Sequence, residues 1–162
     1  MINFIGYIII YISIIFGSIY ISNRFNKKIE SSIIIDILLK IIILYVLGLL
    51  NILKIGVIIL NIVPIILGVI TLIKARKNLI RLKENVLTYG MVFFTILYFS
   101  FIIFTYNRMS NIWDEYSYWS VASKNMFYSN KLMTNTENMI TIYPPIPTVW
   151  QYYFTKTIGL YS

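Results

Sequence analysis

The feature that most constrains this chain is a series of long apolar runs before residue 107. A helix that crosses a bilayer needs about 20 mostly apolar residues. Four runs approach or reach that length, at about residues 2–22, 33–53, 57–73 and 86–106. We therefore expect an all-α integral membrane protein with about four transmembrane helices.

Two absences from the composition exclude several kinds of chemistry. The chain has no cysteine and no histidine. It therefore cannot form disulfides, cannot use a thiolate, and cannot build a Ser-His-Asp triad or a histidine site for zinc or haem. The net charge of +8 would suit a nucleic acid. However, the basic residues are concentrated in two short connections, where membrane topology accounts for them. We expect no nucleic-acid partner.

These basic connections predict the orientation in the cell membrane. Residues 23–32 and 74–85 are separated by two spans, so both can lie in the cytoplasm, as short basic loops do. The N-terminus, the tight turn marked by Asn51, Lys54 and Gly56, and residues 107–142 would then be extracytoplasmic. No basic residue precedes the first run and no small-x-small cleavage site follows it. We expect it to be a retained span rather than a signal peptide.

A few polar residues interrupt the apolar runs. Asp36 and Lys40 are spaced to form a favourable pair on one helix. They lie near the predicted cytoplasmic end of their span, where Lys40 can extend toward the interface. Pro64, with Asn61 one turn earlier, predicts a kink in the third span. We interpret the charged pair as structural. In the alternative, these four residues line a polar path through a small transporter or channel subunit.

The composition changes after Arg108. All three tryptophans lie in this last part, and tyrosines are frequent. Tryptophan and tyrosine favour the headgroup level of a membrane, so we expect an interfacial helix over residues 111–128. A polar connection follows at 129–141, then an extended Pro-rich segment, and a further helix can begin at Pro147.

The chain thus divides into three predicted regions. Residues 1–106 form the four-span bundle, 107–142 an extracytoplasmic loop with the interfacial helix, and 143–162 a Pro-rich entry and the start of a further membrane helix. Because an apolar helix begins so near Ser162, we expect the chain to be the N-terminal part of a longer multi-span protein.

The adjacent carboxylates Asp114 and Glu115 allow two interpretations. As capping residues, they would stabilise the first turn of a helix that begins at Asn111, and the surrounding rings would form an interfacial belt. As functional residues, they would point about 100° apart on a helix, so one could face a cavity. Aromatic rings beside a carboxylate suit a sugar, since its C–H face stacks on rings and its hydroxyls need acceptors. The residues alone leave both interpretations open.

Two short motifs resemble those of a known family. They are Trp113-Asp114-Glu115-x-x-Tyr118-Trp119 and, about 25 residues later, Tyr143-Pro144-Pro145. Their order and spacing resemble the polyprenyl-phosphate-sugar-dependent membrane glycosyltransferases of the GT-C superfamily, which include protein O-mannosyltransferases and lipid A aminoarabinose transferases. Members carry an Asp-Glu motif in the first large extracytoplasmic loop and a His/Tyr-Pro-Pro element before a later membrane helix. Here four apparent spans precede the motif, and Tyr118 stands where a histidine is frequent.

The resemblance implies a reaction and a role for each residue. The chain would move a sugar from a polyprenyl-phosphate donor in the bilayer to an envelope acceptor. Asp114 would be the general base of an inverting displacement, and Glu115 would hold the structure or assist the acceptor. Substrate contacts would come from Arg108, Trp113, Tyr118, Trp119, Lys124 and Tyr143. Arg108 and Lys124 would stabilise the leaving phosphate. No cofactor is specifically implied, and a divalent metal is left open.

The non-enzymatic alternative is a membrane protein that binds another subunit through its aromatic helix.

Overall fold

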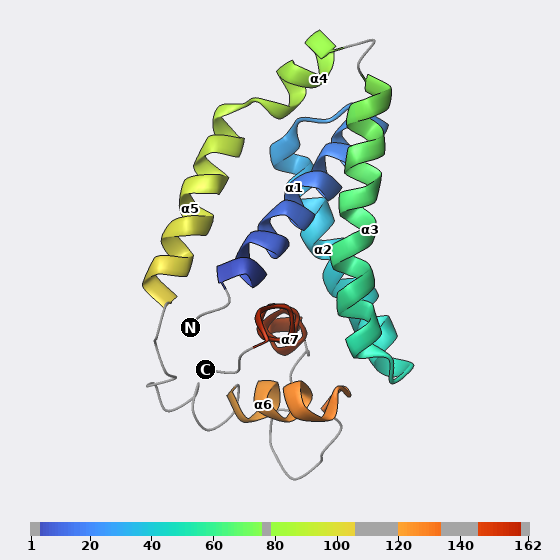
Figure 1. Ribbon diagram of the computed structural model, residues 1–162, viewed down its shortest axis with the longest axis vertical. Helices are drawn as coiled ribbons and strands as arrows, with labels where there is room; N and C mark the ends of the chain where they lie inside the picture. Colours follow the sequence, from blue (N-terminus) through green and yellow to red (C-terminus); the bar gives the residue numbers. More distant parts are fainter. Residues whose placement is uncertain (1–3, 76–78, 106–119, 134–145, 160–162) are drawn as a thin grey trace.

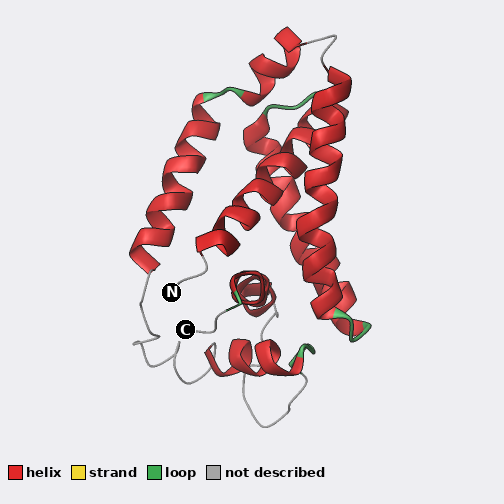
Figure 2. Ribbon diagram, in the orientation of Figure 1, coloured by secondary structure: helices red, strands yellow, loops and turns green. Residues whose placement is uncertain are grey.

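The described part of the structure consists of helices joined by turns and loops. The computed structural model describes residues 4–75, 79–105, 120–133 and 146–159, and these contain no strand (Figure 1, Figure 2). The helices are α1 (Phe4–Phe25), α2 (Ile29–Leu49), α3 (Leu53–Lys74), α4 (Leu79–Val86), α5 (Tyr89–Thr105), α6 (Ser120–Ser129) and α7 (Ile146–Ile158). The predicted all-α class is confirmed for these residues.

Three of the helices are long and apolar enough to cross a membrane. They are α1, α2 and α3, with 22, 21 and 22 residues. At about 1.5 Å per residue, each matches a hydrocarbon core of about 30 Å. Large aliphatic side chains such as Ile34, Leu38 and Ile42 are exposed along α2, as expected for a surface that faces lipid. The chain is therefore built as a multi-pass membrane protein.

The fourth predicted span is represented by a shorter helix. The 17 residues of α5 are strongly apolar, but they are fewer than in the other three helices. Its contacts with α1 are made by aromatic side chains. The Tyr11 hydroxyl lies 2.8 Å from Thr95 Oγ1, and the Tyr98 hydroxyl donates to the carbonyl of Tyr7 at 2.8 Å. A total of four spans stays a prediction.

Several helix boundaries differ from the sequence prediction by up to four residues, and one helix was not predicted. The second helix begins at Ile29 rather than near residue 33, because its polar first turn is helical as well. There Ser32 Oγ donates to the carbonyl of Lys28 at 3.1 Å. The second basic connection also contains a helix, α4, whose apolar residues recur at helical spacing. Hydropathy located the apolar centre of each span but not the polar turns that extend it.

The turn between α2 and α3 is as tight as predicted. Asn51 has φ 59°, a left-handed conformation that asparagine tolerates better than most residues. The amide of Asn51 donates to Gly48 O and the amide of Ile52 donates to Leu47 O, each at 3.0 Å. This pair of bonds ends α2 in a Schellman motif. Lys54 and Gly56, which were expected to mark the turn as well, lie within α3 instead.

The two ends of the bundle carry different connections and helices. The basic connections after α1 and α3 lie at one end, whereas the α2–α3 turn, the start of α1 and the end of α5 lie at the other (Figure 1). Both α6 and α7 are also at this second end. In the same view α7 is seen end-on, and α6 lies below it and is seen from the side. We call this second end the α6–α7 end.

Candidate functional site

Most of the residues predicted for the glycosyltransferase site lie outside the described residues. These are Arg108, Trp113, Asp114, Glu115, Tyr118, Trp119 and Tyr143. Lys124 is described, and its side chain is exposed on α6. The helices that directly follow the two motifs in the sequence are also described. These helices are α6 and α7.

Helices α6 and α7 are joined by side-chain hydrogen bonds. Ser123 Oγ donates to Gln151 Oε1 at 2.5 Å, and the Tyr152 hydroxyl donates to Asn130 Oδ1 at 3.0 Å. Lys156 Nζ donates to the carbonyl of Phe127 at 2.9 Å and lies 4.6 Å from the centre of its ring. A cation near the last carbonyls stabilises the C-terminal end of a helix. The two helices therefore form one packed unit.

Burial shifts the pKa of two side chains in α7. It raises the pKa of Tyr152 to about 12. Burial, with a smaller contribution from nearby Lys54, lowers the pKa of Lys156 below its ordinary value.

A second set of contacts joins α7 to the membrane-spanning helices. The Tyr153 hydroxyl donates to Asn61 Oδ1 at 2.7 Å. Asn61 Nδ2 donates to Thr157 Oγ1 and to the carbonyl of Val57, each at 3.0 Å. Tyr153 is completely buried and Asn61 almost so. One amide in α3 therefore binds two residues that lie one turn apart on α7.

The charged pair predicted in the second span is formed. Asp36 and Lys40 make a buried ion pair, and Lys40 Nζ also donates to the carbonyl of Ser13 at 3.2 Å. Lys40 is 1% exposed. The prediction that it extends to the membrane interface is therefore wrong, because its amine is bound inside the bundle.

Gly17 of α1 leaves the space that the Asp36 carboxylate occupies. A Cβ atom at Gly17 would overlap Asp36 Oδ1 and would lie 3.1 Å from Cβ of Pro64. Small residues allow helix backbones to approach closely within membranes. The absence of a side chain at this position of α1 makes room for the carboxylate of α2.

In the same region, Pro64 leaves the carbonyl of Leu60 without its usual helical donor, because proline has no amide hydrogen. In an unbroken α-helix the amide of residue 64 would donate to the carbonyl of Leu60. Here Ser13 Oγ donates to that carbonyl at 2.8 Å. The helix α3 continues through Pro64 to Lys74. Ser13 therefore links α1 to α3 by its side chain and α1 to α2 by its carbonyl.

These polar residues form two neighbouring hydrogen-bonded groups, which meet where Ser13 binds the carbonyl of Leu60 next to Asn61, and we call them together the junction cluster. Its members are Ser13, Asp36, Lys40, Asn61, Tyr153 and Thr157. The sequence pointed to Asp36, Lys40 and Asn61 as polar groups within spans. Ser13, Tyr153 and Thr157 were missed, although the Ser13/Gly17 spacing of small residues was a usable sign of close packing. The cluster's described hydrogen bonds join its members to one another and to backbone carbonyls, which is typical of a structural network.

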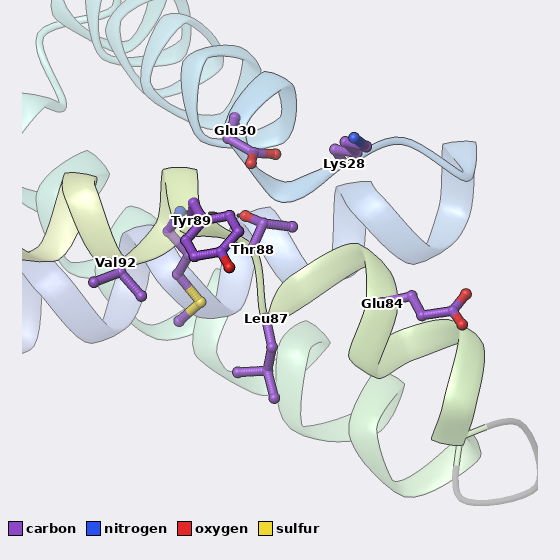
Figure 3. A pocket seen from close by; sticks show the side chains of 8 residues that line it. Lys28, Glu30, Glu84, Leu87, Thr88, Tyr89 and Val92 are labelled. Carbon is purple, nitrogen blue, oxygen red and sulfur yellow. Dashed lines mark hydrogen bonds between the residues drawn. The ribbon is translucent and has the colours of Figure 1, made fainter.

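A hollow of about 590 Å³ lies at the other end of the bundle (Figure 3). It is lined by Lys28, Glu30, Glu84, Leu87, Thr88, Tyr89, Met91 and Val92. No residue of the predicted site is among them. In the part of the chain that the structure describes, no three acidic side chains are grouped closely enough to hold a metal ion.

The fold and its polar interior define a multi-pass α-helical membrane protein. No family model, curated protein or solved structure matches the chain.

Proposed function

We propose that the chain belongs to a GT-C-like membrane glycosyltransferase, which moves a sugar from a polyprenyl-phosphate donor to an acceptor at the outer face of the cell membrane. One observation carries the proposal. The helices that directly follow the Asp-Glu motif and the Tyr-Pro-Pro motif, α6 and α7, pack against each other at the α6–α7 end (Figure 1). Two motifs separated in sequence thus lead into one packed unit, as a shared site requires.

The charge distribution supports the outer face. The basic connections after α1 and α3 lie at the end of the bundle opposite α6 and α7. Basic connections stay in the cytoplasm, so the α6–α7 end would be extracytoplasmic. Lipid-linked sugars that build the envelope are used on that side.

The proposed reaction is a single displacement. Asp114 takes the proton of an acceptor hydroxyl, and the hydroxyl oxygen forms a bond to the anomeric carbon of the sugar. The bond from that carbon to the phosphate oxygen breaks, and the polyprenyl phosphate leaves with the bonding electron pair. The anomeric configuration is inverted. Arg108 and the exposed Lys124 stabilise the phosphate charge, while Trp113, Tyr118, Trp119 and Tyr143 hold the sugar and the donor.

A transporter or channel subunit is the second candidate, and one observation favours it. Three of the four residues assigned to a polar path, Asp36, Lys40 and Asn61, lie in the junction cluster. Ionisable residues within membrane helices often serve transport. However, their polar atoms bond to protein partners, so the glycosyltransferase remains our conclusion.

A transfer assay tests the proposal. Membrane vesicles containing the protein are given a panel of tritium-labelled hexose and pentose polyprenyl phosphates, and the label in water-soluble and protein fractions is counted. We expect transfer from at least one donor. Asp114→Asn should lower the rate by about 100-fold or more, because it removes the general base. Glu137→Gln, which changes another carboxylate of the same predicted loop, should leave the rate unchanged.

Two results would overturn the proposal. One is no transfer from any donor, and the other is equal transfer by Asp114→Asn and the unmodified chain. Ion flux into liposomes that is lost in Asp36→Asn would establish the second candidate instead.

A further inference from the structure

The position of α7 is set by more than apolar contact. Val149, Tyr152 and Tyr153 are fully buried, so α7 does not lie loosely on a surface. Its C-terminal end also touches the backbone of α1. A Cβ atom at Gly6 would lie only 2.6 Å from Cα of Ile158. The helix is therefore packed against the start of the first span.

The polar contacts of α7 with α3 are directional. The ring of Tyr153 stacks on the ring of Trp150, with their centroids 5.3 Å apart. The hydroxyl of Tyr153 donates to Asn61 Oδ1. The amide of Asn61 uses its oxygen for Tyr153 and its nitrogen for Thr157. Because the two ends of one amide have opposite hydrogen-bonding character, sliding or rotating α7 would break both bonds. Apolar packing alone would not select one register so strictly.

The remainder of the junction cluster holds Asn61 in place. Asn61 lies one turn before Pro64, where the carbonyl of Leu60 is bonded by Ser13. Ser13 is bonded in turn by Lys40, which Asp36 neutralises. Side chains from α1 and α2 therefore fix the part of α3 that carries the amide.

We propose that Asn61 and Tyr153 form a positioning lock, which holds α7 in one register against the membrane-spanning helices. The lock thereby fixes Ile146, the first residue of α7, which directly follows the Tyr143-Pro144-Pro145 segment in the sequence. This inference rests on the proposed function, since the segment is assigned there to the donor site. Tyr153 is a positioning residue and does not itself take part in the chemistry.

Tyr153→Phe tests the lock, because it removes the hydroxyl and keeps the ring. Tyr152→Phe is the matched control, since its hydroxyl binds Asn130 beside α6 instead of Asn61. Thr157→Val removes the other bond from Asn61 and serves as a second variant if Tyr153→Phe is not produced.

The first readout does not depend on activity. The chain has no cysteine, so Ile158→Cys supplies a single reporter at the contact with α1. We expect a small maleimide to label this cysteine about tenfold faster in Tyr153→Phe or Thr157→Val, as for loss of one buried hydrogen bond. Labelling in Tyr152→Phe should stay close to that of the parent. Equal rates in all variants would overturn the lock.

The second readout separates positioning from stability. With the labelled donor that the vesicles use, Tyr153→Phe should raise KM for the donor several-fold and change kcat by less than about twofold. A fall in kcat at unchanged KM would mean fewer active molecules, and would overturn the positioning role. Faster labelling in vesicles that transfer no sugar would retain the lock and refute the glycosyltransferase.

Discussion

At the scale of single residues, the buried amine of Lys40 has one partner close in the sequence and one far from it. The partner on its own helix, Asp36, is four residues away and follows from helix geometry. The second partner, the carbonyl of Ser13, lies on another helix. No local pattern predicts that contact, because it depends on how closely α1 approaches at Gly17.

Lys40→Met should be strongly destabilising. The substitution leaves the Asp36 carboxylate buried without its partner, which typically costs about 3–5 kcal/mol. Asp36→Asn/Lys40→Met should cost clearly less, because no unpaired charge remains. Denaturant unfolding in detergent micelles measures both free energies. If the double variant lost as much stability as the two single variants summed, the pair would not be coupled.

At the scale of helices, the contact between α1 and α3 depends on an exchange of hydrogen bonds at Pro64. Pro64 has no amide hydrogen to donate to the carbonyl of Leu60, and the hydroxyl of Ser13 donates to that carbonyl instead. Ser13→Ala should therefore cost about 1–3 kcal/mol, the penalty for a buried carbonyl left unpaired.

The same substitution should cost much less when Pro64 is replaced first. In Pro64→Ala the amide of residue 64 can donate within α3, so Ser13 is no longer needed there. The four chains of this double-mutant cycle are compared by unfolding in micelles. An equal cost of Ser13→Ala in both backgrounds would exclude the exchange.

Sequence reasoning succeeded for the elements that hydropathy defines. The long spans and the turn at Asn51 were predicted, and the last described helix begins at Ile146, one residue before the predicted Pro147. It did less well at polar ends, where α2 extends back to Ile29 and where α4 forms within a basic connection. Hydropathy identifies the segment that can lie in the hydrocarbon core of a bilayer. The ends of a helix are set instead by hydrogen bonding and capping.

At the scale of the whole molecule, the least predictable feature is how α7 is attached. Tyr153 and Asn61 are 92 residues apart, and neither belongs to a recognisable motif. Asn61 could be flagged as a polar residue in a span, but its partner could not. The chemistry of the predicted site depends on residues outside the described ranges, and its resemblance to the GT-C family stays a prediction.

The orientation of the whole molecule can be tested with single cysteines. Lys27→Cys lies in the connection between α1 and α2, and Lys54→Cys lies near the α2–α3 turn. Both side chains are exposed. A membrane-impermeant maleimide should label position 54 in intact cells and position 27 only after permeabilisation. The opposite result would put the α6–α7 end in the cytoplasm, where the proposed outer-face reaction could not occur.

The charged pair in the second span also bears on how the protein is made. Because Asp36 and Lys40 belong to one helix, their charges can cancel as soon as that helix has formed. The apolar part of this helix can therefore leave the translocon for lipid without an unpaired charge, before α3 has been synthesised. Had the carboxylate been encoded in another helix, the ammonium group would have had to enter hydrocarbon alone and wait for it.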